Sequence, residues 1–247
     1  MITRFNPTAN GPIHLGHLYN LLVCYAEADK VALRFDDNQT YWVKLLGHKK
    51  MREIAEQQLY DLNWMGFKFS DICYQSKMEE IVLRRLATSP HWRMVPEHWA
   101  SDPSTYPIII SEPPIEAFGS YFFIAAEKVI LDYVMNTDLL VRGLEFLQEN
   151  ALYSYFCGVF GFPIPKMIYV QRLMTHGGSE LSDISKTLGN WRIEDLRNAG
   201  ISQRDIMTVL RDSCLKNPSG SFGISNLKGA PELSVSSIEE MAYNMTK

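Results

Sequence analysis

The chain has 247 residues, of which 46% are hydrophobic, and a formal net charge of −4. This length and apolar content allow one large core, or one core with a smaller appendage. The mild acidity and the lack of basic runs argue against a dedicated nucleic-acid binder, so any RNA contact must depend on a local patch. No apolar run approaches the roughly eighteen residues of a membrane span, and no signal-peptide pattern is present, so we expect a cytoplasmic protein with no membrane partner.

The four cysteines are far apart and do not form a metal-ligand spacing. They are Cys24, Cys73, Cys157 and Cys214. Isolated cysteines in a cytosolic chain are typically reduced and buried. The sequence therefore predicts no structural zinc and no other metal site.

The first 88 residues alternate between strand-like and helix-like patterns, which is typical of parallel βαβ units. Apolar strands are predicted at residues 2–5, 30–35 and 73–75. Helices are predicted at residues 15–28, 48–62 and 78–87. Residues 1–88 are therefore expected to form the first half of a nucleotide-binding catalytic domain.

The regular pattern stops after residue 88 and resumes later. Residues 89–120 contain a stretch rich in Pro, Trp and Ser, which predicts a short insertion. The second half of the catalytic domain, residues 121–190, is predicted to have strands at 129–134, 139–142 and 166–173 and a helix at 145–160.

The chain is expected to end with a helical extension at 191–215 and a partly ordered tail at 216–247, with a weak helix at 236–245. The predicted fold class is α/β: a Rossmann-type parallel sheet with a short insertion between its two halves and a helical C-terminal extension.

The most informative segment is TRFNPTANGPIHLGH, residues 3–17, which reads as a strand, a loop and the start of a helix. Gly16 allows close approach of a ligand, and the unpaired N–H groups of a helix start favour anions. His14 and His17 share a helical face, where they can donate hydrogen bonds to a phosphate during nucleotidyl transfer. A bare HxxH pattern is more often an accident of composition, but strand, Gly-containing loop and helix in this order favour a function.

Several ordered segments resemble the glutamyl and glutaminyl branch of class I aminoacyl-tRNA synthetases, including its archaeal-type forms. HLGH resembles the family's HIGH motif, and LRFDD at 33–37 resembles its LRIED. LNWMGFKFSDICYQS at 62–76 is similar to LxWLGxxxD…YQS. LLVRGLEF at 139–146 resembles a blend of VIRG and LEF, and YVQRL at 169–173 resembles YxxRL.

This resemblance implies an enzyme that uses ATP and Mg²⁺ to activate an amino acid as an aminoacyl-adenylate and then transfers it to a tRNA. It implies that His14, His17 and a lysine act on the phosphates. It also implies that Gly16, Leu173 and a serine lie at ATP.

The lysine belongs to the family's KxSK-like loop, for which the sequence offers two registers. Counting from YVQRL places Leu181-Ser182-Asp183 over the motif, with an acid in place of the second lysine. Counting back from IEDLRNAG at 193–200, which resembles the family's VEEYREAG, places Ile184-Ser185-Lys186 there. The second register assigns Ser185 and Lys186 and confines the extra residues to the THGGSE loop at 175–180. Asp183 then replaces the first lysine of the motif.

The resemblance also assigns an amino-acid site. Arg4 falls on the arginine that grips the substrate's side-chain carboxylate in glutamyl enzymes, and Arg142 on a second such arginine. Thr8 falls on a serine near the α-amino group, and Asp36 on the glutamate that takes the ammonium. Glutamate is therefore expected in preference to glutamine. The plainer alternatives are that Arg4 pairs with an acid of the protein and that Asp36 caps a turn.

Three differences from the family pattern weaken this assignment of the amino-acid site. The tyrosine and asparagine that complete the glutamyl site fall on Ile124 and Lys128, and the second Asp of LRIEDTD becomes Gln39. A lysine in this site adds positive charge or alters specificity, so the sequence does not decide which amino-acid side chain is bound.

The acceptor is expected to be bound weakly. Full-length relatives continue into an anticodon-binding module, for which about sixty residues after Lys186 leave no room, and the short insertion lacks zinc-binding cysteines. The sequence thus predicts a monomer reduced to its catalytic domain, similar to glutamyl-queuosine-type paralogues, with weak contact to a tRNA acceptor stem.

Two other functions remain open. One is a catalytically weak paralogue that binds nucleotide or RNA as an accessory protein, which Asp183, Gln39 and Lys128 favour. The other is a simple nucleotidylyltransferase with an HxGH loop, against which the amino-acid site residues Arg4 and Asp36 argue.

Overall fold

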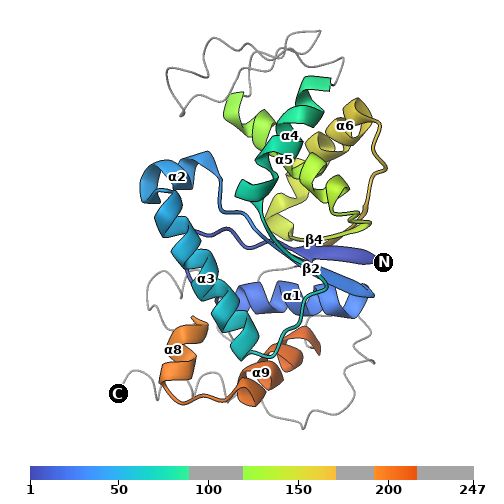
Figure 1. The fold of residues 1–247 in the computed structure, drawn as a ribbon. Coiled ribbons are helices and arrows are strands. Elements are labelled where there is room, and N and C mark those ends of the chain that lie inside the picture. The colour runs from blue at the N-terminus through green and yellow to red at the C-terminus, as the bar shows by residue number, and fades with distance from the viewer. Residues whose placement is uncertain (89–118, 171–191, 216–247) are drawn as a thin grey trace.

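The structure is a computed structural model that describes residues 1–88, 119–170 and 192–215 (Figure 1). The tail and nearly all of the insertion predicted from the sequence lie outside these ranges. The same is true of the THGGSE loop, Leu173, Ser185 and Lys186.

A five-stranded parallel sheet forms the centre of the molecule. Its strands are β1 (Ile2–Phe5), β2 (Lys30–Phe35), β3 (Ile72–Tyr74), β4 (Leu139–Gly143) and β5 (Lys166–Val170). Their order is β3-β2-β1-β4-β5, so the chain builds outward from β1 in one direction and then restarts on its other side with β4. The Rossmann-type sheet is confirmed, and ligands of such sheets bind beyond the strand ends where the order reverses.

The helices of the first half are α1 (Leu15–Glu27), α2 (Thr40–Leu46), α3 (His48–Trp64) and α4 (Gln75–Thr88). The predictions of helices at 15–28, 48–62 and 78–87 are confirmed to within a few residues. Helix α2 was not predicted. Gly47, with a φ of 79°, separates α2 from α3, and a residue without a Cβ adopts that conformation readily.

The second half contains α5 (Gly119–Val134), the short 3₁₀ helix η2 (Leu144–Glu149) and α6 (Asn150–Phe160), followed by α8 (Ile193–Asn198) and α9 (Gln203–Leu215). The prediction of a strand at 129–134 is wrong, because these residues form the end of α5. Ala126, Val129 and Ile130 are buried at helical spacing, and packing on that face outweighs the strand-like run of large apolar residues. The helix predicted at 145–160 is divided between η2 and α6.

Helices cover both faces of the sheet (Figure 1). Apolar residues of α1, α3, α8 and α9 form one core with Phe5, Leu33 and Phe35. Residues of α4, α5 and α6 form a second core on the opposite face with Leu140 of β4. Because side chains alternate along a strand, β4 contributes to both cores, with Leu139 and Val141 in the first and Leu140 in the second.

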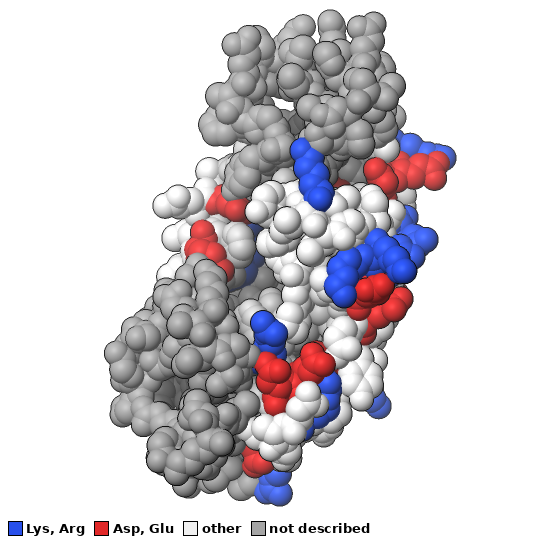
Figure 2. Space-filling view, turned by 90° about the vertical axis from the view of Figure 1, so that its left-hand side faces the viewer, with Lys and Arg blue, Asp and Glu red and all other residues white. Residues whose placement is uncertain are grey.

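The described surface is mixed in charge on the side drawn in Figure 2, where basic and acidic side chains lie close together. Within the described ranges, no helix is long and apolar enough to cross a membrane.

Candidate functional site

Two histidines cap the start of α1 in a reciprocal arrangement. His14 is the N-cap residue in an extended conformation, and the N–H of Gly16 donates to its Nδ1 at 3.2 Å. The N–H of His14 in turn donates to Nδ1 of His17 at 3.3 Å. Since both Nδ1 atoms accept, we assign the ring proton of each histidine to Nε2, which leaves each imidazole with one donor for a ligand.

Both imidazoles are neutral at physiological pH. Burial lowers the pKa of His14 to about 4. Burial, and secondarily the nearby ring of His14, holds the pKa of His17 well below its usual value, and the two ring centroids are 3.8 Å apart. The pair is therefore suited to donating hydrogen bonds to an anion without carrying a positive charge itself.

Gly16 is fitted closely to His14. A Cβ built on Gly16 would lie 3.1 Å from Cε1 and 3.2 Å from Nδ1 of the His14 ring, closer than most real Cβ contacts. A side chain at this position would therefore displace the imidazole.

A later part of the chain returns to this helix start. Arg192 forms an isolated antiparallel bridge with His14, and the N–H of Ile193 donates to the carbonyl oxygen of Ile13 at 3.0 Å. In the sequence, Arg192 follows Lys186 by six residues. The described end of the segment that carries the predicted KxSK-like loop thus lies beside the two histidines.

Three arginines point toward the same layer of helices. Arg4 of β1, Arg34 of β2 and Arg142 of β4 alternate with residues that pack in the α1 core, so their side chains project from the opposite face, toward α5 and α6. All three are buried.

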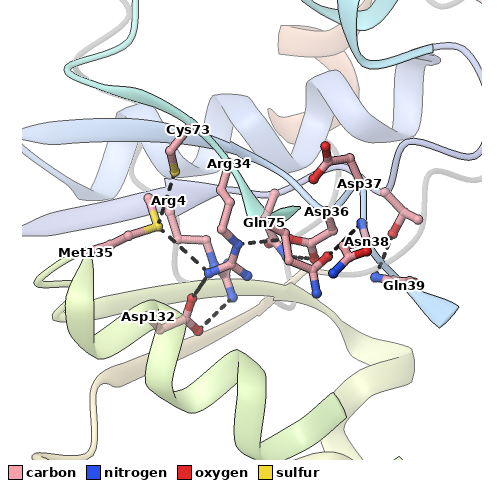
Figure 3. Close-up of polar contacts among 12 residues, drawn as sticks. Arg4, Arg34, Asp36, Asp37, Asn38, Gln39, Cys73, Gln75, Asp132 and Met135 are labelled. Carbon is pink, nitrogen blue, oxygen red and sulfur yellow. Dashed lines mark hydrogen bonds and ion pairs between the residues drawn. The ribbon is translucent and has the colours of Figure 1, made fainter. Parts of the chain in front are cut away.

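The carboxylate of Asp132 on α5 binds two of these arginines (Figure 3). Arg4 donates from Nε to Oδ1 at 3.0 Å and from Nη2 to Oδ2 at 3.2 Å. Arg34 donates from Nη1 to Oδ1 at 2.8 Å, and the Tyr153 hydroxyl donates to Oδ2 at 3.1 Å. The two guanidinium groups hold the pKa of Asp132 below its usual value against the effect of burial.

Asp36, the predicted ligand of the substrate ammonium, also has partners within the protein. Its Oδ1 accepts from Nε of Arg34 at 2.8 Å and its Oδ2 from the Asn6 amide at 2.8 Å. Thr8 forms an isolated parallel bridge with Asp36, and its hydroxyl accepts from the Gln39 amide at 3.3 Å. The structure therefore places the backbones of Thr8 and Asp36 side by side.

Arg142 lies at the end of β4 and is paired with Glu149 of η2. Its Nη2 donates to Oε2 of Glu149 at 2.5 Å, and Nη1 is buried without an acceptor among the described residues. Its guanidinium also lies 5.3 Å from the ring centre of Phe146, and Lys128 Nζ lies 5.9 Å from the same ring. Lys128 and Arg142 thus both contact the Phe146 ring.

Glu127 is a buried acid on the side of α5 that faces Gln75. Burial raises the pKa of its carboxyl to about 7, and a hydrogen bond from Gln75 opposes this shift. The negative charge of Asp36 also raises this pKa. Glu127 is therefore partly protonated at neutral pH.

The sequence analysis missed the acids that hold the arginines. Asp132 was placed in a predicted strand, where its burial against β1 and β2 could not be anticipated, and Glu149 was assigned to a plain helix. Gln58 was also missed, although it is completely buried and its amide donates to the carbonyl oxygens of Thr8 at 2.9 Å and Gly11 at 2.6 Å. A polar residue on the apolar face of a predicted helix was the available signal.

Within residues 1–88, 119–170 and 192–215, no cluster of three or more His, Cys, Asp or Glu side chains could hold a metal ion. Among the described polar groups of this region, the two imidazoles keep a free ring donor, whereas Asp36 and the three arginines are bound to side chains of the protein.

Residues 1–88 match the family described as tRNA synthetases class I (E and Q), catalytic domain, and the resemblance found in the sequence is confirmed for this segment. The chain is 32% identical over 84 residues to the glutamine–tRNA ligase of Clostridium kluyveri, a match that covers 32% of this chain. It is 35% identical over 79 residues to the glutamine–tRNA ligase of Vibrio vulnificus, which covers 30% of this chain. These matches span only 14% and 13% of the relatives' own lengths.

Solved structures share the fold over more of the chain. A glutamate-tRNA synthetase from Elizabethkingia anophelis has a TM-score of 0.53 at 16% identity and covers 76% of this chain and 54% of its own. A tyrosyl-tRNA synthetase from Archaeoglobus fulgidus complexed with L-tyrosine has a TM-score of 0.54 at 16% identity and covers 77% and 60%. At such identities the likeness shows the fold alone.

Proposed function

We propose that this chain, whose residues 1–88 match the class I glutamyl and glutaminyl synthetase catalytic-domain family, activates an amino acid with ATP and passes it to a tRNA or tRNA-like acceptor. The observation that carries this proposal is the start of α1. Two neutral imidazoles and a closely fitted glycine lie at a helix N-terminus, beyond the strands of a Rossmann-type sheet.

In the proposed reaction the carboxylate of the amino acid attacks the α-phosphate of ATP in line, the aminoacyl-adenylate forms and pyrophosphate leaves. The nucleophile is already an anion, so catalysis needs positioning and charge stabilisation rather than a general base. His14 and His17 would donate from Nε2 to the phosphate, and Lys186, with Ser185 beside it, would meet the leaving pyrophosphate. Mg²⁺ would accompany ATP and neutralise charge on the triphosphate oxygens that hold it.

Thr8 and Asp36 are proposed to receive the α-amino group, and Arg4 and Arg142 to face the amino-acid side chain. The resemblance favours glutamate, whereas the curated relatives are glutamine–tRNA ligases. The preference for glutamate depends on the two arginines having charge available for a ligand. Both amino acids are therefore the candidates to test first.

A second candidate, a catalytically weak accessory protein that binds nucleotide or RNA, has its own support in the described site. Asp36 and Arg4, the residues proposed to bind the amino acid, already bind protein partners through two or more atoms. If no ligand displaces these contacts, the amino-acid site stays closed.

ATP–pyrophosphate exchange with each of the twenty amino acids distinguishes the two functions. Exchange driven by glutamate or glutamine, and abolished in a His14→Ala variant that still folds, would support the synthetase. Binding of ATP without exchange for any amino acid would support the accessory protein instead. Exchange driven best by an apolar or basic amino acid would contradict the proposed amino-acid site.

A further inference from the structure

The two arginines proposed to face the amino-acid side chain share a property that the family resemblance does not provide. Each is buried, with 4% of Arg4 and 8% of Arg142 exposed, and each is bound by a carboxylate of the chain itself. Asp132 binds Arg4, and Glu149 binds Arg142. The charge that would attract an acidic side chain is therefore already balanced.

The balance is close to complete around Arg4. Asp132 faces Nε and Nη2 of Arg4 together, so a substrate carboxylate cannot take that edge of the guanidinium without displacing Asp132. The charge of the second cation, Arg34, is balanced by Asp132 and Asp36, although its Nη2 is buried without an acceptor among the described residues. Two arginines and two aspartates thus form a neutral buried group. An added anion would lie beside the negative charge of Asp132, and both arginine charges are already neutralised.

Around Arg142 the balance leaves one hydrogen bond unmade. Glu149 takes Nη2, and Nη1 stays buried without an acceptor in the described part of the chain. A buried donor of this kind is satisfied by a neutral carbonyl oxygen as well as by an anion. The ring of Tyr153 lies 6.0 Å from the Arg142 guanidinium and its hydroxyl binds Asp132, so the two ion pairs are neighbours.

The other cation nearby does not restore a preference for an acid. Lys128 contacts the Phe146 ring but is partly exposed, so solvent and salt screen its charge. Glu127, on the same helix, has a pKa raised by burial to about 7, so at neutral pH it carries part of a negative charge and does not attract an acidic side chain.

We propose that Asp132 and Glu149 are specificity-determining residues that neutralise Arg4 and Arg142 and make the amino-acid site select a carboxamide side chain over a carboxylate. A carboxamide suits both the unpaired donor of Arg142 and the carboxylates that neutralise the arginines. Its carbonyl oxygen would accept from Arg142 Nη1, and its NH₂ group would donate to a carboxylate of the protein. This inference rests on the proposed function. It reverses the order of glutamate and glutamine expected from the resemblance.

The test compares ATP–pyrophosphate exchange driven by glutamine and by glutamate, in the unmodified chain and in two variants. The unmodified chain should favour glutamine at least about tenfold in kcat/KM. Glu149→Gln and Asp132→Asn should each lower this preference by about tenfold, chiefly through a lower KM for glutamate. Glu53→Gln, which removes an exposed acid paired with Lys50, is the matched control and should leave the ratio unchanged.

The outcomes separate the inference from the proposed function. Preference for glutamate in the unmodified chain, or an unchanged ratio in a folded Glu149→Gln protein, would overturn the inference and leave amino-acid activation intact. If no amino acid drives exchange, the proposed synthetase function fails. Thermal protection by glutamine or glutamate then tests the inference alone, and stronger protection by glutamate would overturn it. Glu149 is partly exposed, so its variant is informative even where Asp132→Asn fails to fold.

Discussion

The start of α1 and the arginine network on the opposite face of the sheet differ in how far apart in the sequence their hydrogen-bond partners lie. At the helix start, each polar group is satisfied by a neighbour two or three residues away, and each imidazole keeps a donor for a ligand. In the network, Arg4 and Asp132 are 128 residues apart, and the charges satisfy one another. The first region keeps hydrogen-bond donors that an incoming anion could use, whereas the charges of the second are balanced without one.

The largest expected effect comes from removing the centre of the network. Asp132→Ala leaves two buried guanidinium groups without their shared carboxylate, and we expect the free energy of unfolding to fall by about 3–5 kcal/mol. Glu80→Ala, which breaks an exposed pair with Arg84, should cost less than about 0.5 kcal/mol. Urea unfolding of both variants measures the difference. Equal losses would show that the buried carboxylate of Asp132 contributes no more to stability than an exposed one.

The helix start should respond in activity more than in stability. His14→Ala should lower adenylate formation by roughly 10²-fold while the loss of the cap costs only about 1 kcal/mol. The rate of ATP–pyrophosphate exchange measures this loss.

The register of the KxSK-like loop can be tested in the same assay. Lys186→Ala should lower the exchange rate by a similar factor if Ile184-Ser185-Lys186 lies over the motif. A normal rate for Lys186→Ala together with a loss for Asp183→Ala would select the other register.

The pH dependence of stability tests the acid at the edge of the network. The folded protein raises the pKa of Glu127 from 4.5 to about 7, so it binds the Glu127 proton more tightly than the unfolded chain does. This contribution is fully present below about pH 4.5 and is lost as the pH rises through about 7, a change on the order of 3 kcal/mol. Glu127→Gln should remove that loss, so its stability relative to the unmodified chain should rise between pH 4.5 and 8. A constant difference across this range would exclude the raised pKa.

The smallest effect is expected at Gly16. Gly16→Ala gains helix propensity but places a Cβ 3.1 Å from the His14 ring, so the imidazole must move. We expect stability to change by less than about 1 kcal/mol and exchange to fall by about tenfold. Thermal unfolding and exchange rates measured on one preparation give both numbers. Full activity in this variant would mean that the position of the His14 ring does not matter.

The difference between contacts close in the sequence and contacts far apart in it explains what the sequence could predict. Strands β1, β2 and β4 and helices α1, α3 and α4 follow from local periodicity, and Gly16 and the two histidines follow from a local motif. Asp132 was missed because the run that contains it was assigned to a strand. Its role depends on α5 packing against β1 and β2, a contact between segments more than ninety residues apart. Arg4 and Asp36 were located correctly in the fold, but their partners within the protein depend on such distant contacts, which periodicity does not report.

The loop between β1 and α1 is clamped by two distant elements that are also joined to each other. Gln58 of α3 holds the carbonyl groups of Thr8 and Gly11 on one side of it. On the other side, Arg192, just ahead of α8, and Ile193, its first residue, bind His14 and Ile13 at the end of the loop. Arg197 of α8 in turn binds Asp61 of α3 at 2.7 Å. The loop, α3 and α8 are therefore connected to one another in a ring of polar contacts. We expect a force applied to α8, by a bound partner or a neighbouring domain, to shift the two histidines without any change in the sheet.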